Sequence, residues 1–263
     1  MAFVNSYQSQ APTTEDLSVY VDFGPDPYDV NFCFPIDLAA LETEKVRLLP
    51  FIPRLYAKTY LEQTFQYRDL NVWYSAKPPS SLGEMLYLLE SLRLDSSFVG
   101  LAIIDKGRPD PTHPAWQGSL AGFIALANVS PQNLSAEIGS VRIFPAFQRT
   151  YVTSHAVWLL LRFCLELPSA IPVAGSGLRR VEWGATKGHI ASARVAERMG
   201  FKKEGVTRWH KVVYNTDKGG PQPREGDPLS DKLRSDTEVF SFCADDWEEG
   251  GRELVQRVLK KTM

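Results

Sequence analysis

The sequence has few cysteines and no cysteine motif. Cys33, Cys164 and Cys243 lie far apart, their number is odd, and no CxxC pair occurs. These features argue against a disulfide framework and against a cysteine-based zinc site. Each cysteine lies among apolar residues, so we interpret all three as small buried hydrophobic residues, and we expect no metal.

The sequence also lacks a secretory leader and a long hydrophobic run. Its first residues, MAFVNSYQSQAPTTED, have no basic start followed by an apolar core. The most apolar helical segment, 156–167, contains Arg162 and Glu166 and is too short to span a bilayer. We therefore expect a soluble, cytoplasmic protein with no membrane partner, although the sequence does not separate cytosol from nucleus.

Positive and negative charges are nearly balanced. The 263 residues include 29 Lys and Arg against 31 Asp and Glu, which gives a net charge of −2. A dedicated nucleic-acid binder usually carries a basic stripe, so we expect no nucleic-acid partner. The hydrophobic fraction of 44% is ordinary for a globular chain. The length fits one large domain with extensions, or at most two small domains.

Hydrophobic periodicity predicts alternating helices and strands. Residues 1–42 show no periodicity and are interpreted as an N-terminal arm, followed by one domain over 43–263. Polar, Gly and Pro residues over 215–236 predict a long mobile loop. Strands are expected at 45–49, 98–104, 120–127, 136–144, 180–183, 201–214 and 238–243. Helices are expected at 53–67, 82–92, 153–167, 190–199 and 248–260. This order indicates an α/β domain with a mixed sheet.

The first candidate site is the start of the helix expected at 153–167. A strand passes there through a Pro-containing turn directly into the helix, whose first N–H groups lack partners and carry the positive end of the dipole. The residues at this start are Gln148, Arg149, Thr150, Tyr151, Val152 and Thr153. They suit an anion such as a diphosphate. The alternative is an ordinary helix start capped by Thr153 or Ser154, with Arg149 solvated.

A second strand–loop–helix unit follows, and the two units together resemble a known family. The segment HIASARVAERMGFKKEGVTR, the strand EIGSVRI with its Gln148-led helix start, and the closing EVFSFCADDW occur in order. In these pieces the chain resembles the GNAT superfamily of acyl-CoA-dependent N-acyltransferases over roughly residues 43–260. It is most similar to the RimJ/RimL-like branch, which includes ribosomal-protein N-terminal acetyltransferases.

The resemblance implies a GNAT fold, with a mixed, mostly antiparallel sheet, a splayed parallel strand pair and helices on both faces. In such enzymes the pantetheine arm of acetyl-CoA, the cosubstrate, lies between the splayed strands and pairs like an extra strand. Its partners here would be the backbone groups of Val141, Arg142 and Ile143. The pyrophosphate would lie over residues 148–153.

The chain departs from the family pattern at four positions. Tyr151 and Thr153 replace small residues at the helix start, so Tyr151 must point away from the cofactor, and Thr153 could donate its hydroxyl. His189 replaces an Asn that bonds the pantetheine, and a solvated histidine is the alternative. Ala196 stands where many members place a tyrosine acid. Ser192 matches a serine near the CoA thiol and becomes the candidate acid, unless it only packs on the sheet.

The resemblance also implies direct attack of a neutral amine on the thioester. A base must remove a proton from the amine, and Glu137, at the mouth of the gap, is the first candidate. Glu182 on the neighbouring strand is the second, and an ordinary strand-edge carboxylate is the alternative for Glu137. A backbone N–H near Val141 or Arg142 would hold the developing oxyanion.

The acceptor is the least specified part of the reaction. A small-molecule amine and a peptide N-terminus both fit, and the oligomeric state stays open. Aromatic residues precede the site and either stack on the acceptor or belong to the core, which is the better default: Tyr56, Tyr60, Tyr67, Trp73 and Tyr74. An N-acetyltransferase is the favoured interpretation. The alternatives are a catalytically impaired CoA-binding module and an interaction subunit with the same fold.

Overall fold

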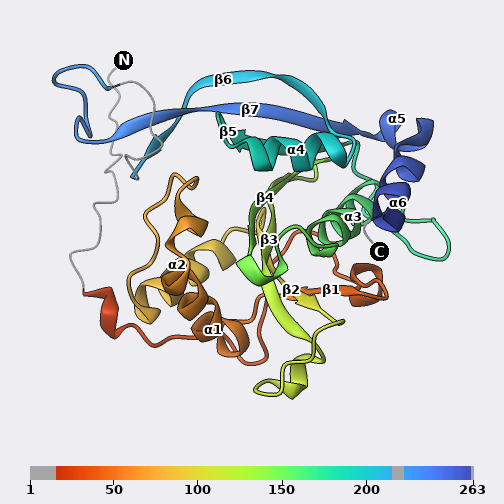
Figure 1. The fold of residues 1–263 in the computed structure, drawn as a ribbon, viewed down its shortest axis with the longest axis horizontal. Coiled ribbons are helices and arrows are strands. Elements are labelled where there is room, and N and C mark those ends of the chain that lie inside the picture. The colour runs from red at the N-terminus through yellow and green to blue at the C-terminus, as the bar shows by residue number, and fades with distance from the viewer. Residues whose placement is uncertain (1–15, 215–221, 262–263) are drawn as a thin grey trace, which may run out of the picture.

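The computed structural model describes residues 16–214 and 222–261, and Figure 1 shows the arrangement of their helices and strands. These residues form a seven-stranded sheet in the spatial order β1-β2-β3-β4-β5-β7-β6. Its strands are β1 (Val46–Pro50), β2 (Val99–Asp105), β3 (Ser119–Ser130), β4 (Ser135–Ile143), β5 (Arg180–Thr186), β6 (Lys202–Val213) and β7 (Leu233–Cys243).

The helices begin where the sequence supplies helix-start residues or buries an apolar face. Pro53 opens the first helix, and the Ser81 side chain accepts a hydrogen bond from the Glu84 N–H at the start of the second. The helices are α1 (Pro53–Gln66), α2 (Leu82–Arg93), α3 (Val152–Leu165), α4 (Ile190–Arg198), the single turn α5 (Ala244–Asp246) and α6 (Arg252–Lys261). Among the described residues, no helix is both long enough and apolar enough to cross a bilayer.

Strand direction and helix placement define the architecture. All neighbouring strands are antiparallel except β4 and β5, which run parallel and are connected through α3. Figure 1 shows α1 and α2 on one side of the central strands, and α3 and α6 on the other. This confirms the expected α/β fold, with a mixed, mostly antiparallel sheet, one parallel pair and helices on both faces.

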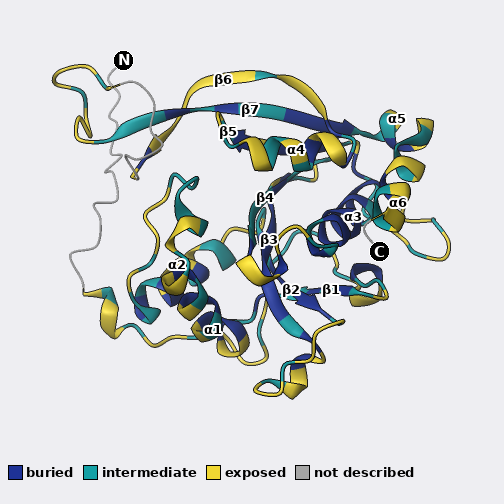
Figure 2. Cartoon of the chain, in the orientation of Figure 1, coloured by how far each residue is buried: buried dark blue, intermediate teal, exposed yellow. Residues whose placement is uncertain are grey.

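Burial is greatest in the central strands and in α3 (Figure 2). Twelve of the fourteen residues of α3 are buried, because the helix packs against the sheet and is also covered by α6 and by residues 38–41. The edge strand β6, in contrast, is exposed along nearly its whole length. The buried core therefore holds α3 in place, and the first candidate site lies at the start of this helix.

Two predictions about the second half of the chain need correction. The loop expected over 215–236 is wrong at its end, because β7 already begins at Leu233 and pairs with β6, with Lys211 opposite Ser235. Backbone pairing forms this part of the hairpin although its side chains are polar. Residues 222–232 form turns, while 215–221 lie outside the described residues. The helix expected at 248–260 begins only at Arg252, after a break at Gly250, whose φ is 109°.

The segment before β1 lies against the domain. The Cys33 N–H donates to the Ser96 carbonyl at 3.0 Å, and the Asn31 amide donates to the Arg93 carbonyl at 2.9 Å. This part of the expected arm is thus held against the end of α2, while residues 1–15 lie outside the described part. The three cysteines are free, but only Cys164 is buried. The prediction of burial is wrong for Cys33 and Cys243, which are half-buried.

Candidate functional site

β4 and β5 are paired at one end and part at the other. Their register includes only the pairs Ser135–Arg180, Ala136–Val181 and Glu137–Glu182. Beyond Glu137, β4 remains paired with β3, and β5 remains paired with β7 along all seven of its residues. A gap therefore opens between the two parallel strands towards their carboxyl ends, and its apex lies at Glu137 and Glu182.

A bulge in β4 marks the first part of this gap. The register with β3 shifts between the pairs Ala125–Gly139 and Phe123–Arg142, so two β4 residues, Ser140 and Val141, oppose one β3 residue. Ser140 adopts a positive φ of 52°. A bulge bends its strand and redirects the groups that follow, which accounts for the turn of β4 away from β5.

The edge of β4 that faces the gap is partly capped by side chains. The Arg142 carbonyl faces β3, since a Cβ placed on Gly122 would lie 2.0 Å from its oxygen. By strand alternation, the backbone groups of Val141 and Ile143 face the gap. The Tyr74 hydroxyl donates to the Val141 carbonyl at 2.5 Å, and the Gln148 amide donates to the Ile143 carbonyl at 2.9 Å. The N–H groups of Val141 and Ile143 thus remain the better partners for a ligand.

The residues before α3 form a tight turn. The Thr150 hydroxyl donates to the Phe147 carbonyl at 2.6 Å and accepts weakly from the Val152 N–H at 3.3 Å. Arg149 is exposed and has a φ of 60°, a left-handed conformation that costs free energy for a residue with a side chain. In the described part of the chain, no side chain accepts a hydrogen bond from the N–H of Thr153. The start of α3 therefore presents donors and a positive charge at the wide end of the gap.

The Tyr151 side chain points towards β2, two strands from β4 on the side opposite β5. Its hydroxyl donates to the buried carboxylate of Asp105 at 2.6 Å, and Lys45 lies over its ring. Burial, followed by the hydrogen bond to Asp105, raises the pKa of Tyr151 to about 12. The ring thus leaves the gap open, as a cofactor at this position requires.

The start of α4 lies across the gap from β4, and His189 precedes it. The imidazole stacks on the Trp73 ring with centroids 4.7 Å apart and planes 4° from parallel. Burial lowers the pKa of His189 to about 4, so the ring is neutral near pH 7. The structure therefore places His189 at the wide end of the gap, with one of its faces covered by Trp73.

Ser192 and Ala196 also lie on α4. The Trp183 ring N–H of β5 donates to the Ser192 hydroxyl oxygen at 3.0 Å, which leaves the Ser192 proton available for another acceptor. Ala196 is fully buried against the sheet. The contact with Trp183 fixes the orientation of Ser192 towards β5.

The two candidate bases at the apex have different partners. The Asn128 amide donates to the Glu137 carboxylate at 2.7 Å, whereas Glu182 accepts from the guanidinium of Arg180 at 2.7 Å. Two glycines lie beside Glu137, since a Cβ on Gly184 would lie 3.3 Å and one on Gly139 3.6 Å from its Oε1. Glu137 thus lies at the closed apex of the gap rather than at its mouth, with a neutral partner and no side chain at either glycine.

Residues 73–75, between α1 and α2, contact both β4 and β5. Besides the contacts of Tyr74 and Trp73 described above, the Trp73 carbonyl accepts from Thr186 at 3.1 Å, and the Ser75 carbonyl accepts from the Tyr214 N–H at 3.2 Å. Sequence reasoning placed these aromatics in the core by default. That default holds for Tyr56 and Tyr60, which are buried. No local signal distinguishes Trp73 and Tyr74, whose position depends on long-range contacts.

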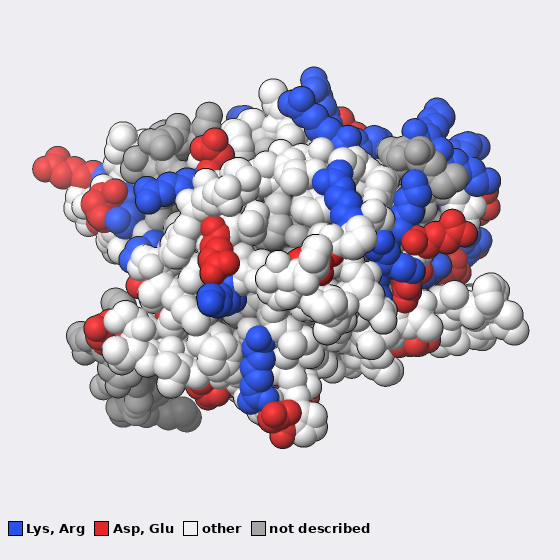
Figure 3. All heavy atoms as spheres, turned by 60° about the horizontal axis from the view of Figure 1, so that its bottom comes forward, with Lys and Arg blue, Asp and Glu red and all other residues white. Residues whose placement is uncertain are grey.

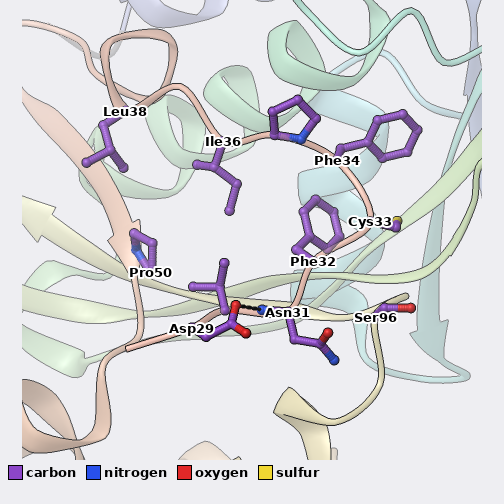
Figure 4. Close-up of a pocket in the computed structure, with 11 residues that line it drawn as sticks. Asp29, Asn31, Phe32, Cys33, Phe34, Ile36, Leu38, Pro50 and Ser96 are labelled. Carbon is purple, nitrogen blue, oxygen red and sulfur yellow. Dashed lines mark hydrogen bonds between the residues drawn. The ribbon is translucent and has the colours of Figure 1, made fainter. Parts of the chain in front are cut away.

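A separate hollow of about 670 Å³ lies against the N-terminal segment (Figure 4). Figure 4 shows that apolar side chains such as Phe32, Ile36 and Leu38 surround it. Burial raises the pKa of Cys33, its one thiol, so that group stays protonated near pH 7. The hollow offers no activated nucleophile, and the gap between β4 and β5 is the better candidate for a reaction site.

The surface view shows charges of both signs interspersed between wide uncharged areas (Figure 3). That face carries no continuous basic stripe. The pattern agrees with the small net charge of −2.

The parted strand pair, the bulge and the two helix starts define an acetyltransferase architecture. A sequence profile of the Acetyltransferase (GNAT) domain matches residues 46–202, more than half of the chain. The chain belongs to the GNAT acetyltransferase family. None of the curated proteins matches it significantly.

Solved structures resemble the chain over most of its length. A GCN5-related N-acetyltransferase from Brucella melitensis is 25% identical, with 83% of this chain and 84% of that chain covered and a TM-score of 0.60. A probable acetyltransferase of the GNAT family from Chromobacterium violaceum is 23% identical over 92% and 100% of the two chains, with a TM-score of 0.63. RimJ from Mycobacterium smegmatis, solved with CoA-disulfide, is 16% identical over 81% and 88%, with a TM-score of 0.60.

Proposed function

We propose that this protein is an N-acetyltransferase that transfers the acetyl group of acetyl-CoA to a primary amine by direct attack. The observation that carries the proposal is the parting of β4 and β5 after the pair Glu137–Glu182. An opened parallel pair offers unpaired backbone groups to an extended, amide-bearing ligand. The family match makes acetyl-CoA, which contains such an arm, the natural occupant.

The described residues fit this cosubstrate. The Ile143 N–H would pair with the pantetheine arm, and the turn at 148–153 would hold the pyrophosphate with backbone N–H groups and Arg149. Tyr151 leaves this path free because it bonds Asp105. His189 would meet the arm from α4 through its edge, since Trp73 covers one of its faces.

Bound acetyl-CoA would supply a thioester carbonyl that a neutral amine can attack. Glu137 would take the proton from that amine, directly or through water, because it lies at the apex with two glycines beside its carboxylate. The Val141 N–H at the bulge would stabilise the negative charge that develops on the carbonyl oxygen. The Ser192 hydroxyl would hydrogen-bond the departing thiolate and pass it a proton, which water would return to the serine.

We further propose membership of the RimJ/RimL-like branch and a place in the cytoplasm. Support for the branch comes from the helix and strand over 189–208, with its Ser192 and Gly200–Phe201, read beside the RimJ structure. Three free cysteines suit a reducing compartment. A small-molecule amine and a peptide N-terminus are both proposed acceptors.

One observation favours a second candidate, a CoA-binding module with impaired catalysis. Tyr74 and Gln148 already occupy the Val141 and Ile143 carbonyls that face the gap, so a ligand must do without those acceptors or displace both side chains. Ala196, in addition, supplies no acid.

Calorimetric titration with acetyl-CoA, followed by thiol release on a panel of amines and N-terminal peptides, tests the two candidates. Binding together with thiol release supports the enzyme. Binding without turnover on any acceptor supports the module. Absence of binding at millimolar acetyl-CoA contradicts both.

A further inference from the structure

Arg142 lies on β4 directly after the bulge, on the sheet face covered by α1. Its Cζ is 3.5 Å from the centroid of the Tyr74 ring, and its strand partner Phe123 contacts Tyr60 of α1. Burial alone would lower the pKa of Arg142, but Tyr60 and Tyr74 raise it, so the side chain carries a full positive charge. A permanent cation therefore lies beside the gap.

This cation lacks an anionic partner within residues 16–214 and 222–261, because no carboxylate there lies within ion-pair distance of Arg142. The Tyr60 hydroxyl, which is neutral, is a side-chain hydrogen-bond partner of Arg142, and the Arg142 Nε is buried without a partner. Arg234 provides a comparison. Its guanidinium stacks on Trp209 at 3.7 Å, much as Arg142 stacks on Tyr74, but it also pairs with Asp236 at 2.5 Å.

A partly buried charge without a counter-ion is costly unless something else compensates it. Stacking on Tyr74 covers one face of the guanidinium and leaves donor edges for another group. Those edges match a carboxylate, which can accept two parallel N–H bonds from one arginine. Arg142 is thus prepared to bind an anion that the chain itself does not supply.

The position of Arg142 relates this anion to the acceptor. The bulge at Ser140 and Val141 takes two residues for one step, so Glu137, Gly139 and Arg142 share one sheet face. The candidate base and the cation therefore lie on the same face, on opposite sides of the bulge. An acceptor attacking at the bulge would have its amine towards Glu137 and its neighbouring groups within reach of Arg142.

We propose that Arg142 binds a carboxylate of the acceptor, so that the substrate is an amine with a carboxylate a few bonds away. This inference rests on the proposed function, since it places the anion beside the attacking amine. The carboxylate is the α-carboxylate of a free amino acid or the side chain of an acidic residue at a peptide N-terminus. A polyamine is a poor acceptor here because the guanidinium repels its second positive charge.

The experiment compares acceptors that differ in the anion, with kcat/KM referred to the concentration of neutral amine because the carboxylate also raises the pKa of the neighbouring amine. Alanine is paired with alaninamide, and a peptide beginning Asp-Ala with one beginning Asn-Ala. Wild type is expected to favour the carboxylate member of at least one pair by about tenfold or more in kcat/KM, mainly through KM. Arg142→Gln removes this preference to within about twofold, and Arg142→Lys, which keeps the charge but not the paired donors, retains part of it. Arg234→Gln is the matched control and leaves the preference unchanged.

A binding measurement separates this inference from the proposed function. The thermal stabilisation of the CoA-loaded protein by N-acetylalanine is compared with that by N-acetylalaninamide, and the N-acetylated peptide pair is treated alike. Stabilisation that requires the carboxylate and Arg142, without turnover on any amine, supports the anion site and contradicts the transferase. Turnover at equal rates on both members of each pair supports the transferase and contradicts the anion site.

Three results overturn the proposal. The first is equal binding of both members of both pairs by wild type. The second is an equal loss for both members in Arg142→Gln, which would assign Arg142 a purely structural role. The third is a stronger preference for O-phosphoethanolamine over ethanolamine than for either carboxylate over its control, which would assign a phosphate instead.

Discussion

The two parts of β4 differ in their partners although they belong to one strand. Residues 135–137 are bonded to β3 on one side and to β5 on the other, while residues 138–143 keep only β3. Each strand keeps its outer partner, β3 for β4 and β7 for β5, but the register shift within the gap lies in β4 and not in β5. The difference teaches that β4 creates the gap, through the bulge at Ser140 and Val141, and that the proposed site begins where its second partner is lost.

The same comparison explains the distribution of side chains around the gap. In the paired part, Glu137 is positioned by a neighbouring amide and two glycines. In the parted part, residues from distant segments, Tyr74 and Gln148, cap the carbonyls that β5 no longer meets. Buried backbone acceptors need partners, and here side chains supply them while leaving the N–H groups for a ligand.

The largest expected effect concerns the apex. Glu137→Gln keeps the hydrogen-bonding shape but removes the base. General-base catalysis typically supplies about 10²–10⁴-fold, so turnover should fall by at least about tenfold. Steady-state thiol release with a good acceptor measures this change. Acetyl-CoA affinity, measured by calorimetry, should be unchanged, because the carboxylate does not hold the cofactor.

Glu182→Gln is the control at the other side of the apex. Glu182 pairs with Arg180, and its side chain is about two-fifths exposed. Its loss should change turnover by no more than about threefold, as expected for an exposed ion pair. If Glu182→Gln lowers turnover more than Glu137→Gln does, the base belongs to β5 and the assignment at the apex is wrong.

The next effect concerns the bulge itself. Ser140 has a φ of 52°, a conformation that a β-branched residue adopts only with strain. Ser140→Val should lower the free energy of unfolding by about 2 kcal/mol and weaken acetyl-CoA binding, because relief of the strain would straighten β4 towards β5. Ser140→Gly should be neutral or stabilising by about 0.5 kcal/mol, since glycine accepts this φ freely. Urea unfolding of both variants checks the pair, and equal stability of the two would show that the bulge does not depend on residue 140.

Most of the fold follows from local sequence patterns, and the gap does not. Alternation and helical periodicity predicted every strand of the described sheet and every long helix, because those signals lie within a few residues. The start of β7 was missed because its first residues, such as Arg234 and Ser235, are polar and are recruited by backbone pairing with β6. The residue-level expectations at the gap came from family resemblance, since no periodic pattern reveals where two strands part.

The contacts of the candidate site were hardest to predict. Tyr151 had to point away from the cofactor, but nothing nearby in sequence names Asp105, 46 residues earlier, as its partner. The stacking of His189 on Trp73 joins residues more than a hundred positions apart. Such contacts depend on the whole fold. The sequence therefore indicated which positions belong to the site, but not the contacts that their side chains make.

A smaller effect separates structure from binding at the start of α3. Tyr151→Phe removes the hydrogen bond to Asp105 and should lower the free energy of unfolding by about 1 kcal/mol. Its KM for acetyl-CoA should not change, because the hydroxyl lies on the β2 side. Thr153→Ala is the matched variant and should show the reverse, with a raised KM and unchanged stability. Thermal unfolding and initial rates measure both, and a raised KM in Tyr151→Phe alone would place the ring in the cofactor path.

The last effect is a pH dependence of stability from His189. Its pKa is about 4 in the folded protein against 6.5 for the free side chain, because burial disfavours the charged form. Between these values the unfolded chain binds a proton that the folded protein does not. The histidine therefore makes the free energy of unfolding fall as pH decreases from about 6.5 to about 4, with no further loss below that range.

His189→Asn tests this sign and restores the residue usual in the family. Urea unfolding at pH 7 and pH 5 should show a smaller pH-dependent loss in the variant than in wild type, since asparagine does not titrate. Above pH 6.5 neither protein should show a contribution from this position, because the imidazole is neutral in both states. If wild type and variant lose equal stability between pH 7 and pH 5, the histidine is freely solvated and is not held against Trp73 in solution.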